Sequence, residues 1–187
     1  SMQVGTYQGA PEKRIDKRKI QLQNILKMAE DKKLDLLCMP EGFLTGYYSE
    51  KQEALENCLQ VESKSFQEWV KLFKIFSGTV IIGFVEQDDG ALYDSAAVIE
   101  KGKLLGIQRK HYRYHTYFTQ DSSFSVFTSK GITFGVIICL DVNYFEPSRI
   151  LSLQGAVILF APMCNLVSFE HPYAKRPSYY SHFVARS

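Results

Sequence analysis

The sequence has little that would mark a membrane, secreted or nucleic-acid-binding protein. No apolar run approaches the roughly 18 residues that a membrane span needs, and the first twenty residues lack the apolar block of a secretion signal. Neither an N-x-S/T sequon nor a CxxC pair occurs. The net charge of +2 favours neither nucleic acid nor an anionic membrane as a partner, and we expect neither.

The cysteines are few and too widely spaced to suggest a disulfide framework. They are Cys38, Cys58, Cys139 and Cys164. Such usage is typical of proteins from a reducing compartment, so we expect a cytoplasmic location.

Histidines are equally scarce, and their surroundings argue against a metal site. His111 and His115 are four positions apart, a spacing that would place both on one side of a helix. No acidic residue lies between them, and the neighbouring Arg109, Lys110 and Arg113 make the segment cationic. We therefore expect no bound metal.

The same segment, "RKHYRYHTYF", interleaves basic and aromatic residues. This pattern suits stacking on bases and contact with phosphates. The near-neutral charge of the chain and the lack of a second basic cluster argue against nucleic-acid binding.

What the sequence does have is the composition of one ordered globular domain. It is 45% hydrophobic and 22% charged over 187 residues, close to ordinary averages. A chain of this length suits a single core, and we find no repeat, low-complexity tract or linker. We predict one domain over residues 1–187.

Apolar periodicity predicts an alternation of strands and helices. Turn residues at "DDG", "KGK" and "SKG" separate the β-rich segments. Strands are expected within residues 2–8, 34–40, 79–110, 124–139 and 156–162, and helices over 15–33, 61–76, 146–154 and from 175 onward. This order predicts an α/β domain in which helices cover packed strands.

Three reactive residues follow predicted strands directly: Glu41, Lys110 and Cys139. In open α/β sheets, functional groups gather beyond the carboxyl ends of the strands, so these three could meet in one pocket. Each also has an ordinary interpretation. Glu41 and Lys110 could be solvated surface charges and Cys139 a buried core thiol. Spacing alone leaves both interpretations open.

The chemistry of such a trio is coherent. A thiol must lose its proton to attack, and Glu41 could take that proton and later return it to a leaving amine. Lys110 would lower the pKa of the Cys139 thiol and stabilise the developing oxyanion, with the backbone N–H of Leu140 as a second donor. A sharp strand-to-turn junction at Cys139 would expose the sulfur, as a nucleophile elbow exposes serine.

Three blocks of sequence strengthen this interpretation. "MPEGFLTGY", "RKHY" and "GVIICLDVNYFEPSRILSLQGAVILFAP" resemble, in order, the signature blocks of the carbon–nitrogen hydrolase (nitrilase) superfamily. The resemblance implies a Glu–Lys–Cys triad at Glu41, Lys110 and Cys139. It also implies a four-layer αββα sandwich, a homodimer or larger homo-oligomer, a small-molecule substrate, and no metal or organic cofactor.

Members of the superfamily hydrolyse nitriles, amides or N-carbamoyl compounds through a covalent thioester-type intermediate. The "GFLTGY" block resembles amidase-type branches, so we expect a small amide or N-carbamoyl substrate. Tyr47 and Asn143 lie close to triad members in the sequence and are candidate substrate contacts. Cys164 is a candidate for the pocket wall, with plain packing as its alternative.

Two departures from the family pattern qualify the resemblance. Family members are longer, so we expect the last strands and the C-terminal tail of the sandwich to be missing from this chain. Many members also carry a second glutamate after the lysine, where this chain has Tyr114 and His115; whether either replaces it stays open. The alternative is a degenerate or truncated relative that acts as a binding or regulatory protein.

Overall fold

The strands of the protein form two sheets in the computed structural model, which describes residues 1–164. The first sheet has the order β1-β2-β3-β4-β5 and the second β6-β7-β8. The strands are β1 (Val4–Thr6), β2 (Leu36–Cys38), β3 (Thr79–Asp88), β4 (Ala91–Glu100), β5 (Lys103–Arg109), β6 (Val126–Ser129), β7 (Ile132–Val136) and β8 (Ile158–Phe160).

The helices form where apolar residues recur at helical spacing. They are α1 (Ile15–Asp31), α2 (Lys51–Asn57), α3 (Lys64–Leu72) and α4 (Phe145–Leu153), with short 3₁₀ helices η1 (Phe73–Ile75) and η2 (Cys139–Asn143). α1 buries Leu22, Ile25, Leu26 and Ala29 along one side. At the start of α3, the Ser63 hydroxyl accepts the N–H of Phe66 and caps the helix.

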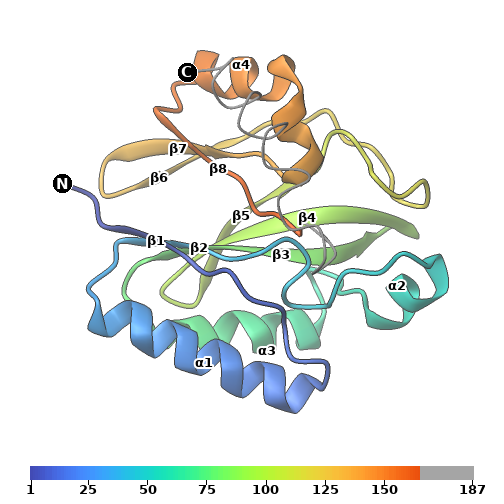
Figure 1. Ribbon diagram of the computed structural model, residues 1–187, viewed down its shortest axis with the longest axis horizontal. Helices are drawn as coiled ribbons and strands as arrows, with labels where there is room; N and C mark the ends of the chain where they lie inside the picture. The colour runs from blue at the N-terminus through green and yellow to red at the C-terminus, as the bar shows by residue number, and fades with distance from the viewer. Residues whose placement is uncertain (165–187) are drawn as a thin grey trace, which may run out of the picture.

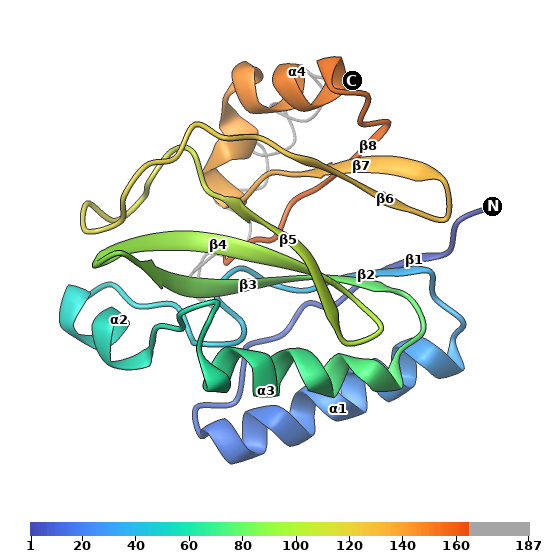
Figure 2. The same cartoon turned by 180° about the vertical axis from the view of Figure 1, so that it is seen from behind.

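These elements stack in four layers (Figures 1 and 2). α1 and α3 cover the outer face of the first sheet, the two sheets face each other, and α4 covers the outer face of the second sheet. The layer between the sheets is apolar and consists of Leu36, Cys38, Ile81, Ala96, Val98, Phe127, Phe134, Val136, Ile138 and Phe160. The predicted αββα arrangement is confirmed.

Strand direction decides which strand ends lie side by side. β1, β2 and β3 run parallel, whereas β4 runs antiparallel to both β3 and β5. The carboxyl ends of β2 and β5 therefore lie at the same edge of the sheet as the beginning of β4. In the second sheet, β7 and β8 are parallel, so their carboxyl ends also share an edge.

The predicted turns are also present. At Asp89–Gly90, Lys101–Gly102 and Lys130–Gly131, both residues have positive φ. Two-residue hairpin turns of this kind match the right-handed twist of the strands they connect.

Some elements differ from the sequence-based expectation. The predicted helix over 61–76 is shorter and ends as η1, α2 was not expected, and β7 stops at Val136. The helix expected from residue 175 lies outside the described residues. Within residues 1–164, no helix is long and apolar enough to cross a membrane.

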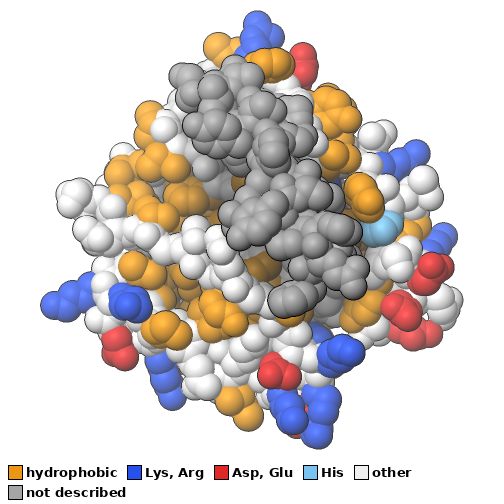
Figure 3. All heavy atoms as spheres, in the orientation of Figure 1, with side chains coloured by type: hydrophobic (Ala, Val, Ile, Leu, Met, Phe, Trp, Pro, Cys, Tyr) orange, Lys and Arg blue, Asp and Glu red, His pale blue; other side chains and the backbone are white. Residues whose placement is uncertain are grey.

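The surface carries charges of both signs. In Figure 3, basic and acidic side chains are interspersed around the edge of the described part of one face, with hydrophobic side chains between them. This distribution agrees with the small net charge of the sequence.

Candidate active site

The fold brings the three predicted catalytic side chains into one cluster, in which Glu41 and Lys110 are buried and Cys139 is half-buried. Glu41 follows β2, Lys110 directly follows β5, and Cys139 opens η2 beyond β7. The Lys110 Nζ atom lies 2.8 Å from the Glu41 Oε1 atom, and both side chains are at most 2% exposed. Removing both charges of an ion pair from water is costly, so a pair buried this deeply marks a candidate functional site.

Cys139 occupies a strained backbone position. Its φ is +43°, in the left-handed region that side chains rarely adopt. Its N–H donates to the Pro162 carbonyl at 2.9 Å, which continues the pairing of β7 and β8 up to the turn. The sharp strand-to-turn junction expected from the sequence therefore lies at this residue.

The surroundings of the thiol keep it protonated. Burial and then the Glu41 carboxylate raise the pKa of Cys139 to about 12, while Lys110 and the Cys164 N–H oppose this rise. The lowering by Lys110 that the sequence suggested is present, but burial and Glu41 outweigh it. A thiol of this pKa is neutral near pH 7 and needs a base during attack.

Glu41 is fixed from two directions. One carboxylate oxygen accepts from Lys110, and the other accepts the backbone N–H of Cys164 at 2.9 Å. The backbone around Glu41 also packs directly on Gly83 of β3, where an added Cβ would lie 2.5 Å from the Glu41 Cα atom. A glycine at position 83 allows this close approach.

Asp94 is a member of the cluster that the sequence analysis did not identify. Its Oδ2 atom lies 3.2 Å from Lys110 Nζ, and its backbone carbonyl accepts the Lys110 N–H at 2.8 Å. Burial raises the pKa of Asp94 well above its ordinary value, Glu41 adds to the rise and Lys110 opposes it. Burial alone would lower the pKa of Lys110, but the carboxylates of Asp94 and Glu41 outweigh it and leave that pKa raised.

The search for reactive residues directly after predicted strands missed Asp94, because β4 begins, rather than ends, at this edge of the sheet. A signal was nevertheless available. In "ALYDSAAVIE", Asp94 alternates with Ala96 and Val98, which face the layer between the sheets. An acidic residue on the apolar side of a strand indicates a buried carboxyl group that needs a partner.

Asp141 is a second buried acidic residue beside the cluster, and it binds the backbone of the segment that follows Lys110. Its buried carboxylate accepts the backbone N–H groups of His111 at 3.0 Å and Tyr112 at 2.7 Å. These bonds connect the segment after Lys110 to η2, which carries Cys139. Burial raises the pKa of Asp141, and the two backbone donors oppose the rise.

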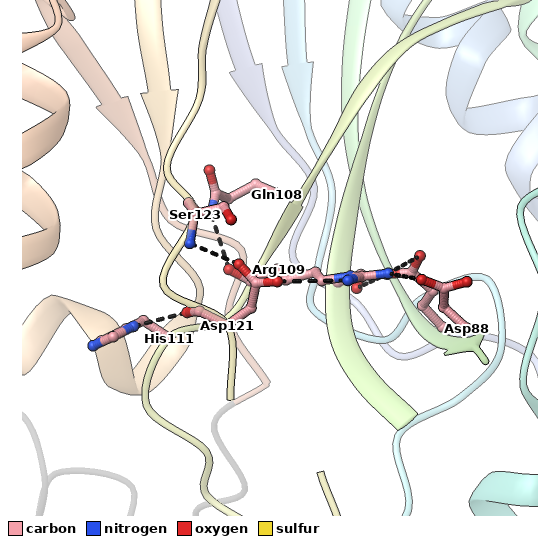
Figure 4. Close-up of polar contacts among 8 residues, drawn as sticks. Asp88, Gln108, Arg109, His111, Asp121 and Ser123 are labelled. Carbon is pink, nitrogen blue, oxygen red and sulfur yellow. Dashed lines mark hydrogen bonds and ion pairs between the residues drawn. The ribbon is translucent and has the colours of Figure 1, made fainter. Parts of the chain in front are cut away.

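A polar network on the other side of β5 anchors the same segment (Figure 4). Arg109 binds Glu86 through two contacts of 2.8 and 3.0 Å and also pairs with Asp88 at 2.8 Å. The ring Nδ1 of His111 lies 2.7 Å from the Asp121 carbonyl oxygen. Because successive residues of a strand face opposite sides, Arg109 belongs to this network while Lys110 faces the cluster.

Tyr47 and His115 form an aromatic wall beside the cluster. Their rings lie 5.3 Å apart. Burial and then the carboxylates of Asp94 and Glu41 raise the pKa of the Tyr47 phenol. Burial and then the Lys110 ammonium lower the pKa of His115. His115 is one of the two residues at the position of the family's second glutamate, and it is close enough to Lys110 and Glu41 for their charges to shift its pKa.

The other residue of that pair, Tyr114, is 68% exposed. Leu140 follows Cys139 in η2, and Asn143 closes the same turn. The Asn143 Oδ1 atom is buried and has no hydrogen-bond partner in the described part of the chain.

A cavity of about 590 Å³ opens beside Glu41. Its walls come from the segments that follow β1, β2 and β8, and Met163 and Cys164 are among them. Within residues 1–164, no group of three or more His, Cys, Asp or Glu side chains could hold a metal ion.

Comparison with known proteins gives a family model and several relatives that match most of this chain. A family model described as carbon-nitrogen hydrolase matches residues 3–186. The chain is 33% identical over 166 residues to a glutamine-dependent NAD(+) synthetase of Thermotoga maritima, covering 84% of this chain and 27% of that protein. It is 31% identical over 167 residues to a nitrilase of Pyrococcus abyssi, covering 86% and 62% respectively.

A third relative is an N-carbamoylputrescine amidase of Solanum tuberosum, 29% identical over 153 residues, with 75% of this chain and 51% of that protein covered. Among solved structures, an amidase from Nesterenkonia sp. superimposes with a TM-score of 0.78 at 15% identity, covering 95% of this chain and 73% of that one. The chain thus spans between 27% and 62% of the length of these curated relatives.

Proposed function

The chain belongs to the carbon-nitrogen hydrolase family, and we propose that it is a cysteine hydrolase that cleaves a C–N bond of a small amide or N-carbamoyl compound. The observation that carries this proposal is the buried pair of Glu41 and Lys110, whose charges both act on the Cys139 thiol. A base, a cation and a nucleophile in one cluster are the parts that acyl transfer through a thioester requires.

In the first half-reaction, Cys139 attacks the substrate carbonyl carbon while its proton moves to the Glu41 carboxylate. The carbonyl π electrons move to the oxygen, and Lys110 and the Leu140 N–H stabilise the oxyanion. The oxyanion then re-forms the carbonyl, the C–N bond breaks, and Glu41 returns its proton to the leaving nitrogen. The products are an amine or ammonia and a thioester on Cys139.

In the second half-reaction, Glu41 takes a proton from water as the water oxygen attacks the thioester carbon. The C–S bond breaks, the acid leaves, and the proton on Glu41 returns to the sulfur. This order agrees with a thiol that is neutral at rest, because each attack is accompanied by proton transfer to Glu41.

The substrate class is supported by the sequence and by the relatives. The "GFLTGY" block resembles amidase-type branches, and the matched proteins include an N-carbamoylputrescine amidase and a glutamine-dependent synthetase. The cavity lined by Glu41 and Cys164 offers room for a small ligand at the Glu41 side of the cluster. Tyr47, Asn143 and Cys164 are the proposed substrate contacts.

The test measures product release and the covalent intermediate together. The protein is incubated with a panel of small primary amides and N-carbamoyl amines, ammonia is quantified, and quenched samples are weighed by mass spectrometry. We expect turnover of at least one compound and an acyl adduct on Cys139. Cys139→Ala should abolish both, whereas Cys58→Ala, which alters a cysteine outside the cluster, should change neither.

The alternative, a non-catalytic relative, makes the opposite prediction. In that case no compound is hydrolysed, and no acyl adduct forms on Cys139. That pair of results would remove the proposed activity and leave a binding or regulatory role.

A further inference from the structure

The mechanism above leaves one buried ionisable group of the cluster without a role. Asp94 lies near the start of β4, its side chain is 2% exposed, and its carboxyl oxygen lies 3.2 Å from Lys110 Nζ. A carboxyl group buried this deeply costs free energy unless a partner compensates it. Its partner is the same ammonium that the mechanism assigns to the oxyanion.

The geometry of the ammonium suggests what Asp94 does. Lys110 has three N–H donors. One is directed at Glu41 and a second at Asp94, which leaves one donor without a partner in the described part of the chain. With a single carboxylate partner, the ammonium could rotate about that contact. Two partners on fixed strands restrict it and so fix the direction of the third N–H.

The influence of Asp94 on the reacting thiol is indirect. The charged groups that act on Cys139 are Glu41 and Lys110. Asp94 contacts Lys110 through both its side chain and its backbone carbonyl, since the two residues are next to the Ser95–Arg109 pair at which the antiparallel pairing of β4 and β5 ends.

We propose that Asp94 is a positioning residue that orients the Lys110 ammonium, so that its third N–H donates to the oxyanion formed when Cys139 attacks a carbonyl. The assignment rests on the proposed function, because it needs an oxyanion at this place. It extends that function by adding a fourth side chain that neither touches the substrate nor transfers a proton. The negative charge of Asp94 is not essential to this role; an oxygen acceptor at its position is.

Two probes of Cys139 separate orientation of Lys110 from activation of the thiol. Propionaldehyde forms a hemithioacetal: the sulfur bonds to the aldehyde carbon, the thiol proton moves to the Glu41 carboxylate and stays there, and the carbonyl π electrons become a lone pair of the oxyanion. Iodoacetamide alkylates the sulfur by displacing iodide and forms no oxyanion. Aldehyde binding is measured as protection of Cys139 from iodoacetamide, followed by mass spectrometry.

In Asp94→Ala, we expect the aldehyde affinity to fall about tenfold or more, because a misdirected oxyanion donor loses much of its effect. The alkylation rate without aldehyde should change less than about threefold. Asp94→Asn, which keeps an oxygen acceptor, should bind aldehyde within about threefold of the wild type. Ser95→Ala removes a buried hydrogen bond to Glu86 from the neighbouring position of β4 and should leave both values unchanged.

Each other outcome overturns the assignment. Equal aldehyde affinity in Asp94→Ala and the wild type removes the positioning role while the proposed hydrolase stands. A parallel loss of aldehyde binding and alkylation in Asp94→Ala indicates a merely structural role. If propionaldehyde fails to protect wild-type Cys139, both the oxyanion site and the role of Asp94 are wrong. An Asp94→Asn variant as weak as Asp94→Ala shows that charge, and not orientation, is what matters.

Discussion

At the scale of single residues, the candidate site combines a neutral thiol with a base. Cys139 has its pKa raised to about 12 by burial and by the nearby Glu41 carboxylate. Thiolate is therefore scarce at neutral pH, and attack depends on proton transfer during the reaction. The same Glu41 charge that suppresses the resting thiolate is the acceptor that the attack requires.

This dual role predicts opposite effects from one substitution. In Glu41→Gln, the neighbouring negative charge is lost while Lys110 remains, so the pKa of Cys139 falls below its wild-type value of about 12. Alkylation by iodoacetamide at pH 8 should become faster, and its pH midpoint should move to lower pH. Turnover should fall by about 10²–10⁴-fold, because the proton acceptor is gone.

The comparison needs the rate of alkylation and the rate of ammonia release from the same preparations. Gln52→Ala, on the surface of α2, is the control and should change neither rate. A Glu41→Gln variant in which both rates fall together would show that Glu41 supports the structure without acting as a base.

At the scale of elements, the site depends on how closely the segment after β2, which carries Glu41, packs against β3. The segment around Glu41 lies against β3 at Gly83, where an added Cβ would be 2.3 Å from the Gly42 nitrogen. That nitrogen belongs to the backbone and cannot rotate away. The glycine therefore determines how closely Glu41 approaches the cluster.

Gly83→Ala should consequently displace Glu41. We expect a loss of about 1–3 kcal/mol in the free energy of unfolding from overpacking. Because misplacing a reacting group by about 1 Å can cost about a hundredfold in rate, turnover should fall by a similar factor. Urea unfolding and ammonia release measure the two effects.

A second glycine provides a control that is matched for stability. Gly90, in the turn between β3 and β4, has φ +78°, and an added Cβ would meet nothing within 4 Å. Gly90→Ala should therefore destabilise the fold by about 1–2 kcal/mol through backbone strain and leave turnover unchanged. Equal turnover in the two alanine variants would contradict the role given to Gly83.

At the scale of the whole molecule, the cluster forms where two sheets meet. Glu41, Asp94 and Lys110 belong to the first sheet and its edges, whereas Cys139 follows a strand of the second. The apolar layer between the sheets therefore sets the distance between nucleophile and base. Phe134 of β7 lies in this layer, fully buried, with ring centroids 5.8 Å from Phe127 and 5.5 Å from Phe160.

Phe134→Ala should lower the free energy of unfolding by about 3–5 kcal/mol, since it removes a buried aromatic side chain and leaves a cavity. We also expect slower turnover, measured as ammonia release, because the distance between Cys139 and Glu41 is then less well fixed. Leu153→Ala, at a position 76% exposed on α4, should change stability by less than about 0.5 kcal/mol. A Phe134→Ala variant as stable as the wild type would mean that the layer between the sheets is not a packed core.

Much of the architecture could be predicted from local patterns. Helix α1, strands β3 to β5 and the turn at Lys130–Gly131 follow from apolar periodicity and from turn residues, because these depend on neighbours along the chain. α2 could not be predicted in this way. It is only seven residues long and buries a single residue, Ala54, so it carries almost no periodic signal.

The sequence by itself determined the order of elements, the family blocks and the reactive residues at strand ends, because each is written in a short run of neighbouring residues. Only the tertiary structure decided that Lys110 lies between Glu41 and Asp94, and that Cys139 is held neutral beside them. The physical reason is that burial and charge proximity arise between segments far apart in the chain. Strand direction and the packing of the two sheets bring those segments together, and no local pattern records their distance.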